Sequence, residues 1–119
     1  MSWHKIRQEV INRFNGHCGY CGDKPDRLQV DHIQPQCRKW VLEKRGVSID
    51  DPSNLMPACA KCNNFKSNMT LETFRKEISK QVDRARSYSV NFRTAERFKQ
   101  ITVTESPIIF YFESFANKT

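Results

Sequence analysis

Hydrophobic positions near the start of the chain recur with helical spacing. Four apolar residues are separated by three or four positions, so they share one face of a helix. These residues are Trp3, Ile6, Val10 and Phe14. Asn15–Gly16 follows them and ends the pattern. The spacing therefore predicts an amphipathic helix over residues 2–15.

The next stretch alternates between apolar and polar residues. Positions 28–33, Leu-Gln-Val-Asp-His-Ile, follow the period of two that is typical of a strand, and Pro35 ends it. Residues 34–53 are predicted to form a long loop with one helical turn near 38–44. Leu55–Met56 is a second, shorter strand candidate.

The second half returns to helical spacing. A helix is expected to open at 63–66, and another over 70–86, where Thr70 could cap the first turn. The apolar face of the 70–86 helix comprises Leu71, Phe74, Ile78 and Val82, and its basic face comprises Arg75, Lys76, Lys80 and Arg84. Apolar runs around the turn at 105–107 predict a hairpin within 98–112. This tail could cover the core, extend a sheet, form a dimer edge or act as a target-specific module.

The chain has 119 residues, a length that predicts a single domain over 1–119. No apolar run approaches the length of a membrane span, and the first residues lack a secretory signal pattern. We therefore expect a cytoplasmic protein. The net charge of +7 favours a polyanionic partner such as nucleic acid, although a merely basic surface would give the same charge.

Four of the five cysteines form two C-x-x-C pairs, Cys18/Cys21 and Cys59/Cys62. An odd cysteine count without a secretory signal argues against a disulfide framework. Zinc prefers four tetrahedral ligands, and each C-x-x-C turn supplies two thiolates. The pairs therefore predict one structural zinc site, whose closed coordination leaves no position for catalysis. Cys37 is left over and is expected to be a free thiol in the loop.

Asp31–His32 lies between the two cysteine pairs. Alone, this dipeptide could be a polar strand end. Together with the text D-H-I-Q-P-Q at 31–36 and S-N-L-M-P-A-C-A-K-C-N-N-F-K at 53–66, it resembles the HNH endonuclease family, in the branch with two zinc knuckles. The resemblance covers 16–68. It implies a ββα-metal core, with the four-cysteine structural zinc site, over 16–68. The elements predicted from spacing flank this core, namely the helix of 1–15 and a helix and β-hairpin in 69–119, so the expected fold class is α+β.

The resemblance also implies a role for each matching residue. Asp31 and Asn63 correspond to the ligands of a catalytic cation, and His32 to the general base. Asn54 corresponds to an asparagine that braces the loop and orients the histidine. Lys66 lies one turn beyond Asn63. It could contact the scissile phosphate or remain a solvated surface lysine.

The implied reaction is a one-metal hydrolysis of DNA that leaves 5′-phosphate and 3′-hydroxyl ends. Many relatives carry histidine where this chain has Asn63. An amide oxygen with a carboxylate makes an all-oxygen site, which favours Mg²⁺ or Mn²⁺ over Zn²⁺.

The expected partner is DNA, in double-stranded form, and a homodimer could convert nicking into double-strand cleavage. The loop residues Arg38, Lys39, Lys44 and Arg45 could contact the DNA backbone or remain solvated. The basic face of the 70–86 helix is a second candidate contact. Family members of this size favour a phage or bacterial origin. Two alternatives remain open: a non-catalytic, zinc-stabilised nucleic-acid-binding module, and a zinc domain that binds protein.

Overall fold

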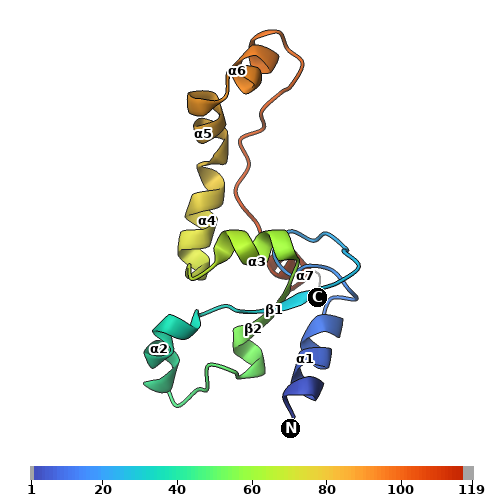
Figure 1. Cartoon of the computed structure of the whole chain (residues 1–119), viewed down its shortest axis with the longest axis vertical. Coiled ribbons are helices and arrows are strands. Elements are labelled where there is room, and N and C mark those ends of the chain that lie inside the picture. The colour runs from blue at the N-terminus through green and yellow to red at the C-terminus, as the bar shows by residue number, and fades with distance from the viewer. Residues whose placement is uncertain (1, 117–119) are drawn as a thin grey trace. The chain divides into compact units, whose positions relative to one another are not determined.

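The computed structural model describes residues 2–116, which fold into two compact units. Within the described range, the first unit comprises residues 2–71 and 109–116, and the second comprises 72–108. The first contains α1 (Trp3–Asn12), β1 (Gln29–His32), α2 (Trp40–Glu43), β2 (Leu55–Ala58), α3 (Ala60–Lys66) and α7 (Tyr111–Ala116). The second contains α5 (Gln81–Tyr88), α6 (Val90–Arg97) and all but the first residue of α4 (Leu71–Ser79) (Figure 1). None of the helices in the described range is long and apolar enough to cross a membrane.

The centre of the first unit is an antiparallel pair of strands, β1 and β2. Asp31 lies opposite Met56, and His32 lies opposite Leu55. Helix α1 contacts both strands, and α3 contacts β1. Every residue of β2 is buried. In β1, Gln29 is exposed, Val30 and His32 are half-buried and Asp31 is buried, so the exposure does not follow the apolar and polar alternation of the sequence. The mixed helix-and-sheet class inferred from the sequence is confirmed.

Helix α1 confirms the first predicted element. Ser2 caps it by accepting a hydrogen bond from the Lys5 amide at 3.3 Å. The helix ends at Asn12, earlier than predicted, and Val10 on it and Phe14 just beyond it are buried. Arg13 ties the end of the helix to the sheet, because its guanidinium donates to the carbonyl oxygens of Leu55 (2.7 Å) and Pro52 (2.9 Å).

The predicted 70–86 helix is interrupted. Helix α4 ends at Ser79, and α5 begins at Gln81. Side chains at the break compete with the helical ladder: the Ser79 hydroxyl donates to the Lys76 carbonyl at 2.6 Å, and the Gln81 amide donates to the Glu77 carbonyl at 2.8 Å. In the same unit, Arg86 forms an ion pair with Glu96 that joins α5 to α6 (2.7 Å).

The hairpin predicted within 98–112 is wrong. The structure assigns no strand to residues 98–110, and α7 begins at Tyr111. The apolar run 108–112 is used for packing instead. Phe110 is buried with its ring edge-on to Tyr20, and the amides of Tyr111 and Phe112 donate to the carbonyls of Tyr20 and Gly19. The tail of the first unit therefore braces the first cysteine turn.

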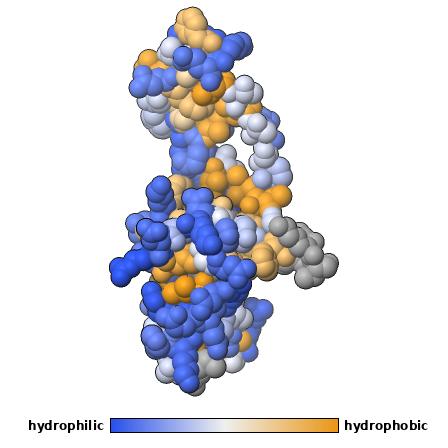
Figure 2. All heavy atoms as spheres, turned by 90° about the vertical axis from the view of Figure 1, so that its right-hand side faces the viewer, coloured by the Kyte–Doolittle hydropathy of each residue, from blue (hydrophilic) through white to orange (hydrophobic). Residues whose placement is uncertain are grey.

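Figure 2 shows a face on which hydrophilic residues dominate the surface of the first unit. Hydrophobic residues are visible on the second unit in the same view, and in this unit Val90 and Phe98 are 66% and 69% exposed.

Candidate metal centre and catalytic site

The first cysteine turn, residues 18–22, is shaped by two glycines. Gly19 lies directly against β2, with its amide donating to the Pro57 carbonyl at 2.7 Å, and a Cβ at this position would collide with the Met56 side chain. Gly22 has a φ of +83°, a left-handed conformation that glycine adopts without strain. These features hold Cys18, which is fully buried, and Cys21, which is exposed, on one tight turn.

The second pair lies at the start of α3. Cys59 is the N-cap residue, and its sulfur accepts a hydrogen bond from the Cys62 amide at 3.4 Å. Matching N–H···S bonds occur in the first turn, from Tyr20 to Cys18 (3.4 Å) and from Asp23 to Cys21 (3.5 Å). Backbone donors of this kind stabilise thiolates in metal sites.

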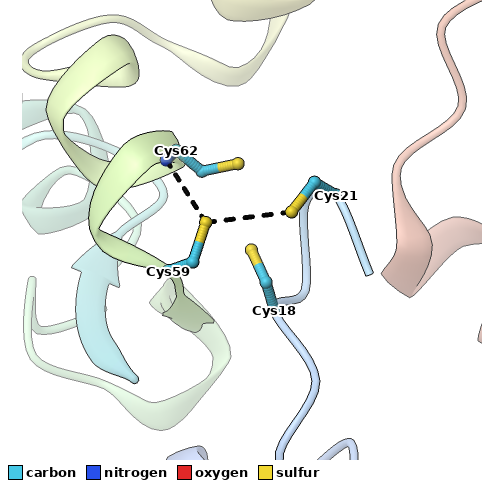
Figure 3. Close-up of side chains that lie close together, drawn as sticks. All are labelled: Cys18, Cys21, Cys59 and Cys62. Atoms are coloured by element: carbon cyan, nitrogen blue, oxygen red, sulfur yellow. Dashed lines mark hydrogen bonds between the residues drawn. The ribbon is translucent and has the colours of Figure 1, made fainter. Parts of the chain in front are cut away.

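The four sulfurs converge on one point (Figure 3). All lie within 4.8 Å of one another, and the Sγ atoms of Cys21 and Cys59 are 3.8 Å apart. A tetrahedral zinc ion with Zn–S bonds near 2.3 Å requires an S···S separation of about 3.8 Å. The geometry therefore fits a four-thiolate metal site, and the predicted grouping of these cysteines is confirmed.

Hydrogen bonding and burial shift the pKa of three of the four thiols when no cation is bound. A hydrogen bond from the Cys62 thiol lowers the pKa of Cys18 to about 4, and the same bond, together with burial, raises the pKa of Cys62. Burial raises the pKa of Cys21 to about 11. Without a cation the cluster therefore retains protons, and an ion that binds all four sulfurs must displace them.

Asp31 is held from two sides. The Tyr20 hydroxyl donates to Asp31 Oδ2 at 2.6 Å, and the Lys66 ammonium lies 2.9 Å from the same oxygen. The Asp31 side chain is 7% exposed and that of Lys66 is 0% exposed. Burial, together with the charge of Asp31, raises the pKa of Tyr20, so the phenol stays protonated and acts as the donor.

This arrangement corrects the two sequence readings of Lys66. The residue is neither a solvated surface lysine nor turned toward solvent where a phosphate could reach it. Its ammonium also donates to the His32 carbonyl at 2.9 Å, so Lys66 fixes the end of β1. Burial is tolerated because the charge is paired and hydrogen-bonded.

His32 lies at the end of β1 with its ring 16% exposed. Its Nε2 atom is 2.8 Å from Asp50 Oδ1, in the loop that precedes β2. The side-chain amide of Gln36 lies 3.4 Å from both ring nitrogens. The ring is therefore oriented by both ends of the loop, with Nδ1 directed away from the carboxylate.

Asn54 is buried and braces the same loop. Its Oδ1 accepts from the Gln34 amide at 2.8 Å, and its Nδ2 donates to the carbonyls of Ile49 (2.8 Å) and Gln34 (3.2 Å). The Asn54 carbonyl accepts from the Ile33 amide at 2.8 Å. These bonds connect the residues after His32 to the residues around Asp50.

Asn63 projects from the middle of α3 toward β1. Its Nδ2 donates to Gln29 Oε1 at 2.5 Å. Gln29 and Asp31 are two positions apart on β1 and therefore share one face of the strand. The structure thus brings Asn63 to the strand that carries Asp31, and its amide oxygen makes no hydrogen bond within the described residues.

Comparisons with known proteins identify the same segment of the chain. A family model described as HNH endonuclease matches residues 18–69. This matched stretch, here called the HNH segment, is similar to the HNH endonuclease family. The SPbeta prophage-derived protein YoqL of Bacillus subtilis (strain 168), itself named as a putative HNH endonuclease, is 27% identical over 104 residues. The alignment covers 84% of this chain and 42% of that protein, so the chain spans about two fifths of its relative's length. No solved structure matches.

The HNH segment contains the basic loop predicted to contact DNA. Arg38, Lys39, Lys44 and Arg45 are all exposed. Two of them lie over the half-exposed ring of Trp40, with Arg38 Cζ at 5.7 Å and Lys44 Nζ at 5.0 Å from its centroid. Cys37, in the same loop, is an exposed free thiol, as expected.

Sequence reasoning missed three residues that contact the HNH centre. Tyr20 and Asp50 hold Asp31 and His32, and Gln29 bonds to Asn63. Tyr20 lies between the two cysteines of a C-x-x-C turn, where the motif assigns it no role. Asp50 lies 18 positions from His32 in the sequence. Only Gln29, in register with Asp31 on the strand, carried a signal that could have identified it.

Proposed function

We propose that this chain is a metal-dependent DNA endonuclease that hydrolyses phosphodiester bonds, with His32 as general base and a single divalent cation. The observation that carries the proposal is the His32 environment. An imidazole bound at Nε2 by a carboxylate, at a strand end in an HNH segment, is suited to accepting a proton at Nδ1.

The carboxylate of Asp50 gives His32 its orientation. With Nε2–H donated to Asp50, the Nδ1 lone pair is the basic site, and a water in line with a phosphorus atom would lose its proton there. The Asp50 charge also stabilises the imidazolium that results. Asn54 keeps the two ends of the loop together, so it is a positioning residue for His32.

The donor atoms of a catalytic cation would be Asp31 Oδ1 and Asn63 Oδ1. Both are oxygens, which supports Mg²⁺ or Mn²⁺. A cation held there supplies positive charge for the phosphate and the leaving oxygen. Because Tyr20 and Lys66 already engage Oδ2, Asp31 offers one oxygen of a partly neutralised carboxylate, so we expect weak cation affinity. Zinc is the proposed occupant of the four-cysteine site.

The Asp31–Lys66 pair also supports a second candidate. A carboxylate neutralised by a buried ammonium could have a purely structural role, which would make the chain a zinc-stabilised nucleic-acid-binding module without catalysis. The two candidates share the cysteine site and the basic surface. They differ in whether DNA is cut.

Incubation with supercoiled plasmid in different divalent cations separates them. The nuclease proposal predicts conversion to open-circular or linear DNA in Mg²⁺ or Mn²⁺, with ends that a ligase reseals directly because they carry 5′-phosphate and 3′-hydroxyl groups. Activity with Zn²⁺ alone would contradict the proposed catalytic cation. Binding to the plasmid without strand breaks in any divalent cation would favour the second candidate.

A further inference from the structure

Two adjoining hollows lie on the first unit beside the cysteine site. Their volumes are about 400 and about 680 Å³, and both are lined by Arg27 and Ala60. Because they share these two lining residues, the two hollows are together called the Arg27 groove. Its walls come from α1, the loop at 23–28, and the start of α3.

Four cations line the Arg27 groove. Arg7 comes from α1, Lys24 and Arg27 come from the loop, and Lys61 comes from α3. Among residues 2–116, none of them forms an ion pair with a carboxylate, although Asp23 and Asp26 also line the walls. The groove therefore has a net positive charge contributed by three separate segments.

The basic face of α4 and α5 differs in this respect. Lys80 and Arg84 are paired with Glu77 at 3.1 and 2.7 Å, and Lys76 lies 3.7 Å from Glu72. Their charges are partly compensated within the unit. Cations without such partners release more counterions when they bind a polyanion, so the Arg27 groove is the stronger phosphate-binding surface.

The groove shares one residue, Gln29, with the surroundings of the proposed catalytic centre. Gln29 lines the larger hollow, and its side chain accepts the hydrogen bond from Asn63. A polyanion in the groove would thus lie next to a proposed ligand of the catalytic cation. The surface is concave, which suits the ridge formed by a sugar-phosphate backbone.

We infer that the Arg27 groove binds the phosphate backbone of DNA on one side of the scissile bond. This inference rests on the proposed function, because it takes DNA as the polyanion. The contacts involve charge and shape alone, so they position the duplex without reading its sequence. The site is independent of the basic loop at 38–45.

The test is fluorescence anisotropy with a labelled DNA duplex, over a range of salt concentrations and without added Mg²⁺ or Mn²⁺. The groove variant is Arg7→Gln/Arg27→Gln/Lys61→Gln in the full chain. The control, Lys76→Gln/Lys80→Gln/Arg84→Gln, removes the same charge from α4 and α5. We expect the slope of log K against log salt to fall by about 1 for each groove cation, hence by about 3, and by less than about 1 in the control.

Equal losses of slope in both variants, or no loss in the groove variant, would overturn the inference. If the triple variant shows no thermal unfolding transition, the single variants Arg27→Gln and Lys61→Gln are used in its place. Each is expected to lower the slope of log K against log salt by about 1. Tighter binding to an RNA duplex of the same sequence would also overturn it, since DNA would then not be the preferred occupant.

These outcomes are separable from the proposed nuclease activity. If the wild-type chain cleaves plasmid but the groove variant keeps the wild-type salt slope, the groove inference is refuted and the nuclease proposal stands. If DNA binding depends on the groove cations but no divalent cation supports cleavage, the catalytic proposal is refuted and the groove inference stands.

Discussion

The buried pair of Asp31 and Lys66 makes a strong prediction about stability. Lys66→Met keeps the volume and apolar stem of the side chain but removes its ammonium. Asp31, 7% exposed, then keeps only the Tyr20 hydroxyl as a partner for Oδ2, and the His32 carbonyl loses its donor. Removing one member of a buried ion pair typically costs about 3–5 kcal/mol.

That loss is large for a domain of this size. Small domains unfold with a free energy of about 5–15 kcal/mol, so Lys66→Met should lose a large share of the stability of the first unit. The double variant Asp31→Asn/Lys66→Met removes both charges and should recover part of the loss, because no unpaired charge is left in the interior.

Urea denaturation of the zinc-loaded chain, followed by circular dichroism, measures both effects. Lys61→Met is the matched control, since Lys61 is an exposed lysine on the same helix, and it should change the free energy of unfolding by less than about 0.5 kcal/mol. A Lys66→Met variant within about 1 kcal/mol of the wild type, or a double variant less stable than the single, would refute this reasoning.

Three further changes test neighbouring parts of the site. Cys59→Ser should reduce bound zinc, measured by atomic absorption, from about one ion per chain to almost none and should abolish cooperative unfolding, whereas Cys37→Ser should alter neither. Asp50→Asn should slow plasmid nicking by about 10- to 100-fold, a part of what a general base contributes. It should leave thermal stability nearly unchanged because the Asp50 side chain is itself 55% exposed, and nicking at the wild-type rate would show that Asp50 does not assist His32. Asn54→Ala should lower the free energy of unfolding by about 1–3 kcal/mol, since the Ile49 carbonyl and the Gln34 amide both lose their partner, and an unchanged urea midpoint would exclude this bracing role.

The sequence predicted those features that depend on local spacing. The apolar stripe of α1 and the alternation in β1 gave the first helix and strand nearly to their ends, and the C-x-x-C spacing gave the sulfur cluster. These patterns are local consequences of helix, strand and turn geometry. The family resemblance then placed Asp31, His32 and Asn63 in one region.

Features set by tertiary contacts were not predictable in the same way. The run at 108–112 has the composition of a strand, but Phe110 packs beside Tyr20 and the next residue begins a helix. The burial of Lys66 depends on its pairing with Asp31, far earlier in the sequence, and a lysine one turn beyond Asn63 gives no sign of it. Nor could the sequence show that cations from α1, the 23–28 loop and α3 line one groove.

The central claim is that His32 performs the chemistry of this HNH segment. It is tested most directly by the rate of supercoiled plasmid nicking in Mn²⁺ and Mg²⁺ by the wild type and by His32→Ala. Both proteins must first be shown to bind zinc and to share a melting temperature. The account predicts that nicking falls by at least about 100-fold in His32→Ala, since a general base contributes on the order of 10²–10⁴ in rate, while affinity for DNA is retained. Equal nicking by the two proteins would contradict it.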